Sequence, residues 1–396
     1  MLKKTGFLIA GIFSLNALMA QKDIEKKIQT DLIMVEDGSV VQIDEGSFQI
    51  SSSLSLDGKK NVIIRGMGID KTILSFKNQV SGAEGIRVTN CENVILEDMT
   101  VQDSKGDLIK TMHVKGITFR RVKAEWTGKA SEKNGSYALY PVQCEGVMID
   151  SCIAIGASDA GIYVGQSKNI VVKNCIAENN VAGIEIENSL QAEVYDNLAT
   201  GNTGGILVFD LPNLVQKKGG FVKVYHNKII ENNHVNFAPK GNIVGKVPMG
   251  TGVLILATSH VDVYENEIIN NKTMGLGIIS YYMTENKIKD KEYYPYPTAI
   301  NVHDNNFERK HRRVPMRGRF AQIYYFKLKF GRNVPNIIYD GIVDKKNLDA
   351  NGNVKDEMRI CIAGNKNETF ANIDAWNDFK NISRDLTPYN CKDAKK

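Results

Sequence analysis

Side chains that can exchange protons recur at one position of a short repeated phrase. Two residues after a glycine or its equivalent, successive copies carry Arg87, Lys110, Tyr137, Tyr163, Glu185 and Leu207. A lysine can act as a base when a neighbouring arginine lowers its pKa, and a tyrosine can return the proton. The pattern therefore predicts Lys110 as the base and Arg87 as a clamp for a carboxylate. Tyr137 or Tyr163 would be the acid. The alternative is that outward strand positions simply carry polar or aromatic side chains.

Acidic candidates lie close to the same positions. Two residues further along, the copies carry Thr89, Met112, Leu139, Gly165, Glu187 and Phe209. The acids themselves are Asp159, Glu185, Glu187 and Asp210. Paired carboxylates can serve as the acid and base of a glycosidase or as oxygen ligands for Ca²⁺. Glu185 and Glu187 would lie roughly 7 Å apart on one side of a strand, which permits either role. We predict that the four acids and Phe209 contact a substrate, and a solvated acidic patch is the alternative.

The elements that must position these residues also repeat. A second phrase of alternating apolar residues begins at Asn93, Gly116, Gly146, Asn169, Ala192, Val222, Val261 and Ile300, with spacings of 23, 30, 23, 23, 30, 39 and 39 residues. A coil of about 23 residues with loop insertions explains all of these spacings. Alternation at period two predicts strands with one inward and one outward side. Units of this length hold too few strands for a propeller blade, so we predict an all-β, right-handed parallel β-helix.

Asparagines fall at one phase of this repeat. They are Asn174, Asn197, Asn227, Asn266 and Asn305. Stacked coils place equivalent residues about 4.8 Å apart, so their amides can hydrogen-bond from coil to coil. We predict a structural asparagine ladder here. The insertion between Asn227 and Val261 would be a loop that overhangs one face.

The N-terminal segment indicates export. Lys3 and Lys4 precede an apolar run from Phe7 to Met19, which is typical of a signal peptide and too short to span a membrane. Residues 1–20 would be removed, and the mature protein would be periplasmic or secreted and not membrane-spanning.

The remaining chain divides into three predicted parts. Residues 21–60 would form an N-terminal cap and the first coil, with Ile24, Ile28 and Leu32 on one side of a short capping helix. Residues 61–307 would form the repeats, and residues 308–396 a small, basic C-terminal cap or extension.

The cysteines and histidines restrict the chemistry. Cys361 and Cys391 lie outside the repeats and are the better candidates for a disulfide, whereas Cys152 and Cys175 are one coil apart and would be stacked buried thiols. The six histidines show no metal-ligand spacing, and the chain has no Cys-x-x-Cys motif. Haem and structural zinc are therefore not expected. Ca²⁺ is the one cofactor that the acids allow.

A basic segment near the C-terminus carries more positive charge than the whole chain does on balance. From Arg309 to Arg332 there are nine lysines and arginines and no acid, against a net charge of +5. Aromatic residues are mixed with them, which in a cytosolic protein would indicate nucleic acid. Export instead favours an anionic polysaccharide, lipopolysaccharide headgroups or an acidic partner. A solvated flank is the alternative.

Several segments resemble known proteins. Asp44-Glu-Gly-Ser-Phe and Leu54-Ser-Leu-Asp-Gly are similar to the first coils of pectate-lyase-like β-helix proteins. Ala138-Leu-Tyr-Pro-Val and Gly204-Gly-Ile-Leu-Val-Phe resemble a narrower group of bacterial exported β-helix repeat proteins, which are sometimes encoded beside a di-haem cytochrome. The resemblance covers most of the mature chain. It implies the fold and no particular activity.

Two functions follow as hypotheses. In the first, the protein binds an anionic polysaccharide along one outer face and cleaves or modifies it, as a lyase, an epimerase or a glycoside hydrolase does. No complete motif of these enzymes is present, so the pattern leaves catalysis open. In the second, the protein is a non-catalytic docking or structural component of the cell envelope, for which the resemblance suggests a cytochrome as redox partner.

Overall fold

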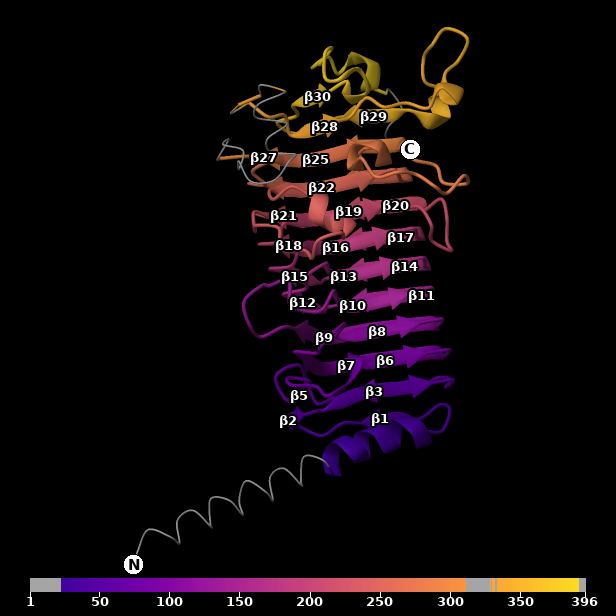
Figure 1. The fold of residues 1–396 in the computed structure, drawn as a ribbon, viewed down its shortest axis with the longest axis vertical. Helices are drawn as coiled ribbons and strands as arrows, with labels where there is room; N and C mark the ends of the chain where they lie inside the picture. The colour runs from indigo at the N-terminus through magenta and orange to yellow at the C-terminus, as the bar shows by residue number, and fades with distance from the viewer. Residues whose placement is uncertain (1–22, 311–327, 329, 332, 392–396) are drawn as a thin grey trace, which may run out of the picture.

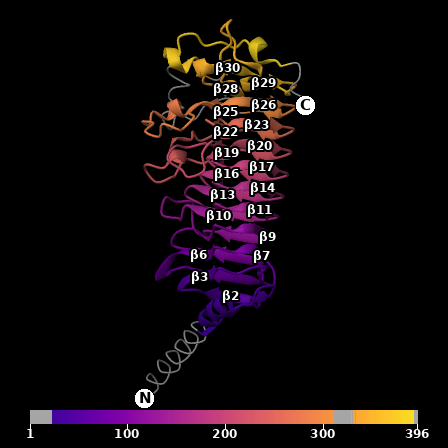
Figure 2. The ribbon, with the colours of Figure 1, turned by 90° about the vertical axis from the view of Figure 1, so that its right-hand side faces the viewer.

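The computed structural model describes residues 23–310, 328, 330–331 and 333–391. The predicted signal peptide and most of the basic segment from Arg309 to Arg332 lie outside these residues. The described chain is a stack of coils, seen from two sides in Figures 1 and 2. Every pairing between two of its named strands is parallel, as β13 with β16 and β14 with β17 illustrate. This confirms the predicted parallel β-helix.

The strands form two sheets. Sheet B has eleven strands: β3 (Ser52–Asp57), β6 (Ser81–Thr89), β8 (Ile109–Met112), β10 (Tyr137–Val142), β13 (Ala160–Gly165), β16 (Ala182–Glu187), β19 (Gly204–Phe209), β22 (Thr251–Leu256), β25 (Met274–Ile279), β28 (Ile337–Tyr339) and β30 (Phe370–Asn372). Sheet A has nineteen: β1 (Val40–Gln42), β2 (Gly46–Gln49), β4 (Ile63–Arg65), β5 (Thr72–Ser75), β7 (Glu92–Gln102), β9 (Lys115–Glu125), β11 (Glu145–Asp150), β12 (Ile153–Ile155), β14 (Lys168–Lys173), β15 (Ile176–Glu178), β17 (Leu190–Tyr195), β18 (Leu198–Thr200), β20 (Gly220–Tyr225), β21 (Lys228–Ile230), β23 (Ser259–Tyr264), β24 (Glu267–Ile269), β26 (Thr298–His303), β27 (Asn306–Glu308) and β29 (Ile360–Ala363). A regular coil supplies two strands to sheet A and one to sheet B.

The core lies between the sheets and consists of the inward residues of each strand. Val147, Ile162 and Ile184 are buried there, as the alternation predicts. Glycines allow the coils to stack closely: a Cβ on Gly205 would lie 2.7 Å from the carbonyl oxygen of Gly252. That position therefore excludes any larger residue.

The asparagine ladder is confirmed, with a correction at its start. Its amides hydrogen-bond from coil to coil at 2.9 to 3.0 Å through Asn197, Asn227, Asn266, Asn305 and Asn365. The prediction for Asn174 was wrong, because Cys175 occupies the ladder position and its N–H donates to Asn197 Oδ1. Lys168 pairs with Leu190, so this coil has 22 residues and a count of 23 shifts the phase by one.

A second ladder was not predicted. Its amides bond at 2.8 to 3.2 Å through Asn180, Asn202, Asn232 and Asn271. The signal was present in the sequence, because these asparagines follow the first ladder at a constant offset. Both ladders satisfy polar groups inside the solenoid.

Both ends of the stack are covered. The predicted capping helix spans residues 23–34 and buries Ile28 and Leu32 against the first coil. At the other end β28, β29 and β30 extend the sheets past residue 307. The predicted disulfide between Cys361 and Cys391 is present, and Tyr389 packs against Phe370 with ring centroids 4.8 Å apart. Cys152 and Cys175 are free and buried, as predicted.

Short 3₁₀-helices lie in the connecting segments. They are η1 (Ile243–Lys246), η2 (Tyr281–Thr284), η4 (Lys345–Asn347), η5 (Asp356–Met358), η6 (Ala375–Asn377) and η7 (Thr387–Tyr389). Residues 231–250 and 280–297 are the longest connections between β18 and β27, and Figure 2 shows loops projecting from one side of the solenoid at this level. Within the described ranges, no helix is long and apolar enough to cross a membrane.

Candidate functional site

The predicted row of outward side chains exists on sheet B, with one replacement. Arg87 of β6 pairs with Lys110 of β8, and Lys110 pairs with Tyr140 of β10. Further along, Tyr163 of β13 pairs with Glu185 of β16. The row therefore contains Tyr140 where Tyr137 was predicted. We call Arg87, Lys110 and Tyr140 the open row.

Tyr137 was placed in the row because the register of β10 was predicted incorrectly. Tyr137 pairs with Ala160, and Leu139 faces the core opposite Ile162. Val142, not Leu139, is the member of the second row, because it pairs with Met112 and Gly165. Gly135, which marked the phrase in the sequence, precedes the strand in a turn packed against Gly106. The match of Ala138-Leu-Tyr-Pro-Val to Gly161-Ile-Tyr-Val-Gly would have given the correct register.

Three tyrosines nevertheless meet at the end of the open row. The ring centroid of Tyr137 lies 4.4 Å from those of both Tyr140 and Tyr163, and the latter two are 5.1 Å apart. Lys110 Nζ lies 5.0 Å from the ring centroid of Tyr140 and 3.9 Å from Glu84 Oε1. Arg87 is exposed. The open row thus leads from two cations onto an aromatic cluster.

Carboxyl groups lie directly behind the tyrosines. Tyr163 OH donates a hydrogen bond of 2.6 Å to Glu187 Oε1. Within the described part of the chain, neither side-chain oxygen of Glu185 has a hydrogen-bond donor, although this residue is only 1% exposed. The carboxyls of Glu185 and Glu187 are neighbours, and the repulsion between two negative charges favours the protonated form of Glu185.

Burial raises the pKa of these acids and so favours their uncharged form. Desolvation raises the pKa of Asp159, Glu187 and Asp210 to about 7 each. It raises the pKa of Glu185 well above the ordinary value, and the neighbouring carboxyl of Glu187 adds to the effect. We call these four residues the acid cluster. Groups with a pKa near neutrality can both donate and accept protons under ordinary conditions.

Other titratable groups around the cluster follow the same physics. Burial raises the pKa of Asp107 to about 6 and that of Tyr140 to about 12. It raises the pKa of Tyr137 and Tyr163 further, and nearby carboxyls contribute to the shift. The three phenols are therefore neutral at ordinary pH and can donate a proton.

The acid cluster is not a solvated patch, which corrects the alternative considered for it. Glu185 and Glu187 are buried, and Phe209, predicted to contact substrate, is only 1% exposed. Asn242, in the insertion, donates a hydrogen bond of 2.8 Å to Asp159 Oδ2. Gly219 N donates to Asp210 Oδ1 at 2.9 Å. The insertion and loops fold over positions that a bare solenoid would expose.

Among the described residues, no group of three or more His, Cys, Asp or Glu side chains is arranged to hold a metal ion. Ca²⁺ stays a prediction of the acid pattern.

A feature of sheet A was missed. Tyr195, Tyr225, Tyr264 and His303 stack along its outer side, with ring centroids 4.9 to 5.1 Å apart and interplanar angles of 12° or less. Their signal was the residue after valine in successive phrases. Because the ring faces cover one another, the stack primarily supports the coils.

Comparison with known proteins agrees with this architecture. The family described as right handed beta helix region matches residues 52–213. The pre-neck appendage protein of Bacillus phage B103 is 24% identical over 209 residues, which is 44% of this chain and only 24% of the phage protein. The chain thus spans about a quarter of that relative's length.

Solved structures resemble the chain over a larger share of its length. The A-module of the Azotobacter vinelandii mannuronan C-5 epimerase AlgE4 has a TM-score of 0.53 at 12% identity, covering 87% of this chain and 90% of the module. The A-module of AlgE6 from the same organism has a TM-score of 0.51 at 13% identity, with the same coverage. At such identity the likeness concerns the fold alone. The family match and the parallel pairing of the strands show that the chain folds as a right-handed parallel β-helix.

Proposed function

We propose that the protein binds an anionic polysaccharide along the open row and transfers protons to and from it at the acid cluster. The observation that carries this proposal is that cationic, aromatic and acidic side chains follow one another along the outer side of sheet B. Arg87 and Lys110 pair in register, Tyr140 follows Lys110, and its ring contacts Tyr163, which donates to Glu187. Positive groups that hold carboxylates are thereby joined to groups that exchange protons.

The chemistry that suits this arrangement starts next to a carboxylate. Removal of the proton from the carbon that bears a carboxylate leaves negative charge on that group, which Arg87 and Lys110 would stabilise. Tyr163 would take this proton while passing its own phenolic proton to ionised Glu187. A proton from the Tyr140 phenol returned to the opposite face of the carbon gives epimerisation. The same proton given to the departing glycosidic oxygen gives elimination, and water then reprotonates Tyr140 and takes the proton from Glu187.

This assignment changes the role predicted for Lys110. Glu84 and Asp107 lie beside its ammonium group, so a contact with substrate carboxylates suits Lys110 better than service as the base. In the proposal Tyr163 takes the proton from the substrate, and Glu187 accepts the phenolic proton of Tyr163. The resemblance in fold to mannuronan epimerase modules is compatible with this chemistry and does not identify the substrate.

The proposal is tested with polyuronates. Titration calorimetry with alginate and pectate measures binding, absorbance at 235 nm detects elimination, and deuterium uptake from D₂O detected by NMR reports proton exchange. We expect binding by the wild type, loss of turnover in Tyr163→Phe with retained binding, and unchanged behaviour in Lys223→Ala on sheet A. Circular dichroism checks that each variant is folded. Failure of the wild type to bind any polyuronate contradicts the proposal.

A second candidate is a non-catalytic docking role in the cell envelope. The burial of Glu185 and Glu187 favours it, since neither carboxyl is open to solvent. Binding without elimination or proton exchange would select this role. The partner would be an envelope component, and the proposed export places either function outside the cytoplasm. Fractionation of cells that produce the full chain tests the location, and a pull-down with a di-haem cytochrome tests that partner.

A further inference from the structure

The outer side of sheet B changes character halfway along the solenoid. In β6, β8 and β10 the row is polar and accessible: Arg87 is exposed, and Lys110 and Tyr140 are partly exposed. In β19 and β22 the same row is apolar, because Glu185 pairs with Leu207 and Leu207 with Leu254. Leu207 and Leu254 are 0% and 3% exposed. The row is therefore covered where it becomes apolar.

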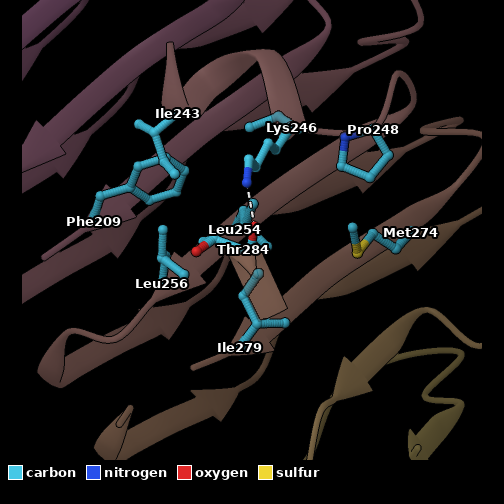
Figure 3. Close-up of a pocket in the computed structure, with 10 residues that line it drawn as sticks. Phe209, Ile243, Lys246, Pro248, Leu254, Leu256, Met274, Ile279 and Thr284 are labelled. Atoms are coloured by element: carbon cyan, nitrogen blue, oxygen red, sulfur yellow. Dashed lines mark hydrogen bonds between the residues drawn. The ribbon is translucent and has the colours of Figure 1, made fainter. Parts of the chain in front are cut away.

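The cover is the insertion at residues 231–250, which we call the wall. Val244 and Val247 of the wall are buried in one cluster with Phe209 and Leu254. Figure 3 shows Ile243, Lys246 and Pro248 of the wall around the outward side chains of sheet B. The free space between them is about 20 Å³, which holds about one water molecule and no sugar ring.

Hydrogen bonds fix the wall in this place. Asn236 Nδ2 donates to the carbonyl oxygens of Val244 and Val247, at 2.9 Å each. Lys246 Nζ donates to Asn286 Oδ1 at 2.8 Å and to the carbonyl oxygen of Thr284. At the edge that faces the open row, Asn242 bonds to Asp159. The wall is therefore tied to itself, to the segment 280–297 and to the acid cluster.

A polymer that follows the open row toward the C-terminus meets this wall at the acid cluster. The row is accessible at β6, β8 and β10, three strands about 4.8 Å apart. Beyond them Tyr163 is 4% exposed and Glu185 is 1% exposed. A chain passing through in mid-polymer would need the space that Val244 and Val247 fill.

We infer that the site takes the end of an anionic polysaccharide chain, with the terminal sugar against Tyr163 and Asp159 and the next sugars along Lys110 and Arg87. This inference rests on the proposed function and adds the kind of substrate: chain termini, not internal segments. The wall is the element that determines this specificity.

The first test counts proteins per chain. Oligogalacturonides and oligomannuronates of a short and a long defined length are titrated into the full mature protein by calorimetry. We expect one protein per chain at both lengths for the polymer that binds. A number of bound proteins that grows with chain length would overturn the inference while leaving the proposed function intact. Absence of binding at either length would overturn both.

The second test blocks the ends. A bulky fluorophore is attached to one terminus or to the other of the same oligosaccharide. A label at one terminus should weaken binding at least tenfold, and a label at the other should have little effect. Equal affinities for both labelled forms and the unlabelled form would overturn the inference.

A wall deletion connects the effect to these residues. The distance from Asn232 to Asn271 is 39 residues, and deleting residues 234–249 reduces it to the 23 residues that separate Cys152 from Cys175. If the variant folds by circular dichroism, the penalty of the blocking label should shrink. A folded variant with an unchanged penalty contradicts the role of the wall. If it does not fold, the two wild-type tests decide.

Discussion

Two sets of buried polar side chains run from coil to coil, and they differ in how completely they are hydrogen-bonded. In the asparagine ladder, Asn227 Nδ2 donates to Val194 O and to Asn266 Oδ1, and its own Oδ1 accepts from Asn197. In the acid cluster, neither oxygen of Glu185 meets a donor within the described ranges. Both sets are buried to a similar degree, with Asn227 and Glu185 each 1% exposed.

The difference separates a structural from a functional use of burial. The hydrogen bonds of a fully paired amide offset the free-energy cost of removing it from water, and they fix the register of the coils. A carboxyl without a partner costs stability and is retained where its shifted pKa serves chemistry. The comparison therefore predicts opposite effects of substitutions in the two sets.

The largest effect is expected in the ladder. Asn227→Ala removes the acceptor of the Asn197 backbone N–H and the Nδ2 donor to the carbonyl of Val194. Asn197 Nδ2 and Asn266 Oδ1 each lose one of their two hydrogen bonds. Each buried unsatisfied group costs about 1–3 kcal/mol, so the free energy of unfolding should fall by about 3–5 kcal/mol. Urea denaturation monitored by circular dichroism measures this. A loss below about 1 kcal/mol would mean that the ladder is not essential.

In the acid cluster, by contrast, a substitution is expected to increase the free energy of unfolding at high pH. The pKa of Glu187 is about 7 in the folded protein and 4.5 for the ordinary group, so the folded state binds more protons between these values. The contribution of Glu187 to stability is full below about pH 4.5 and is lost as the pH rises toward 7. Glu187→Gln removes this loss and can still accept from Tyr163.

The variant should therefore be more stable than the wild type at pH 8, by up to about 3 kcal/mol, and similar to it at pH 4.5. Urea denaturation at several pH values compares the two proteins. Parallel pH profiles would show that Glu187 is not responsible, and Glu193→Gln on sheet A serves as the matched control.

A smaller effect is expected at the open row. Lys110→Ala removes one positive contact at a partly exposed site, which should weaken polyuronate binding about tenfold, or about 1.4 kcal/mol. The loss should shrink at high salt. Lys223→Ala, on the opposite sheet, should bind as the wild type does. An equal loss in both variants would indicate general charge attraction and no defined row.

The smallest effect on stability is expected at Cys175, the one ladder position described above that is not an asparagine. Cys175 occupies the ladder position in its coil, and its N–H already donates to Asn197 Oδ1. Cys175→Asn should add one amide hydrogen bond to Asn197 and raise the free energy of unfolding by about 1 kcal/mol. Thermal denaturation tests this. A marked destabilisation would show that the thiol volume, not the hydrogen bond, matters there.

The repeat in the sequence was sufficient to predict the fold, because alternation and recurring turn residues are local properties. Register was less secure. A coil of 22 residues moved the ladder from Asn174 to Cys175, and a turn glycine misplaced Tyr137. The buried state of the acid cluster could not be predicted, because it depends on residues 231–250 folding back over distant coils. The Asn242 to Asp159 bond spans 83 residues and has no periodic signal.

The most direct test of the account is a crystal structure of the protein with a short oligouronate. We predict carboxylates of the ligand beside Arg87 and Lys110 and the terminal sugar beside Tyr163, stopped by the wall. A ligand on the outer side of sheet A, along Tyr195, Tyr225 and Tyr264, would contradict the account. So would a chain that continues past the wall.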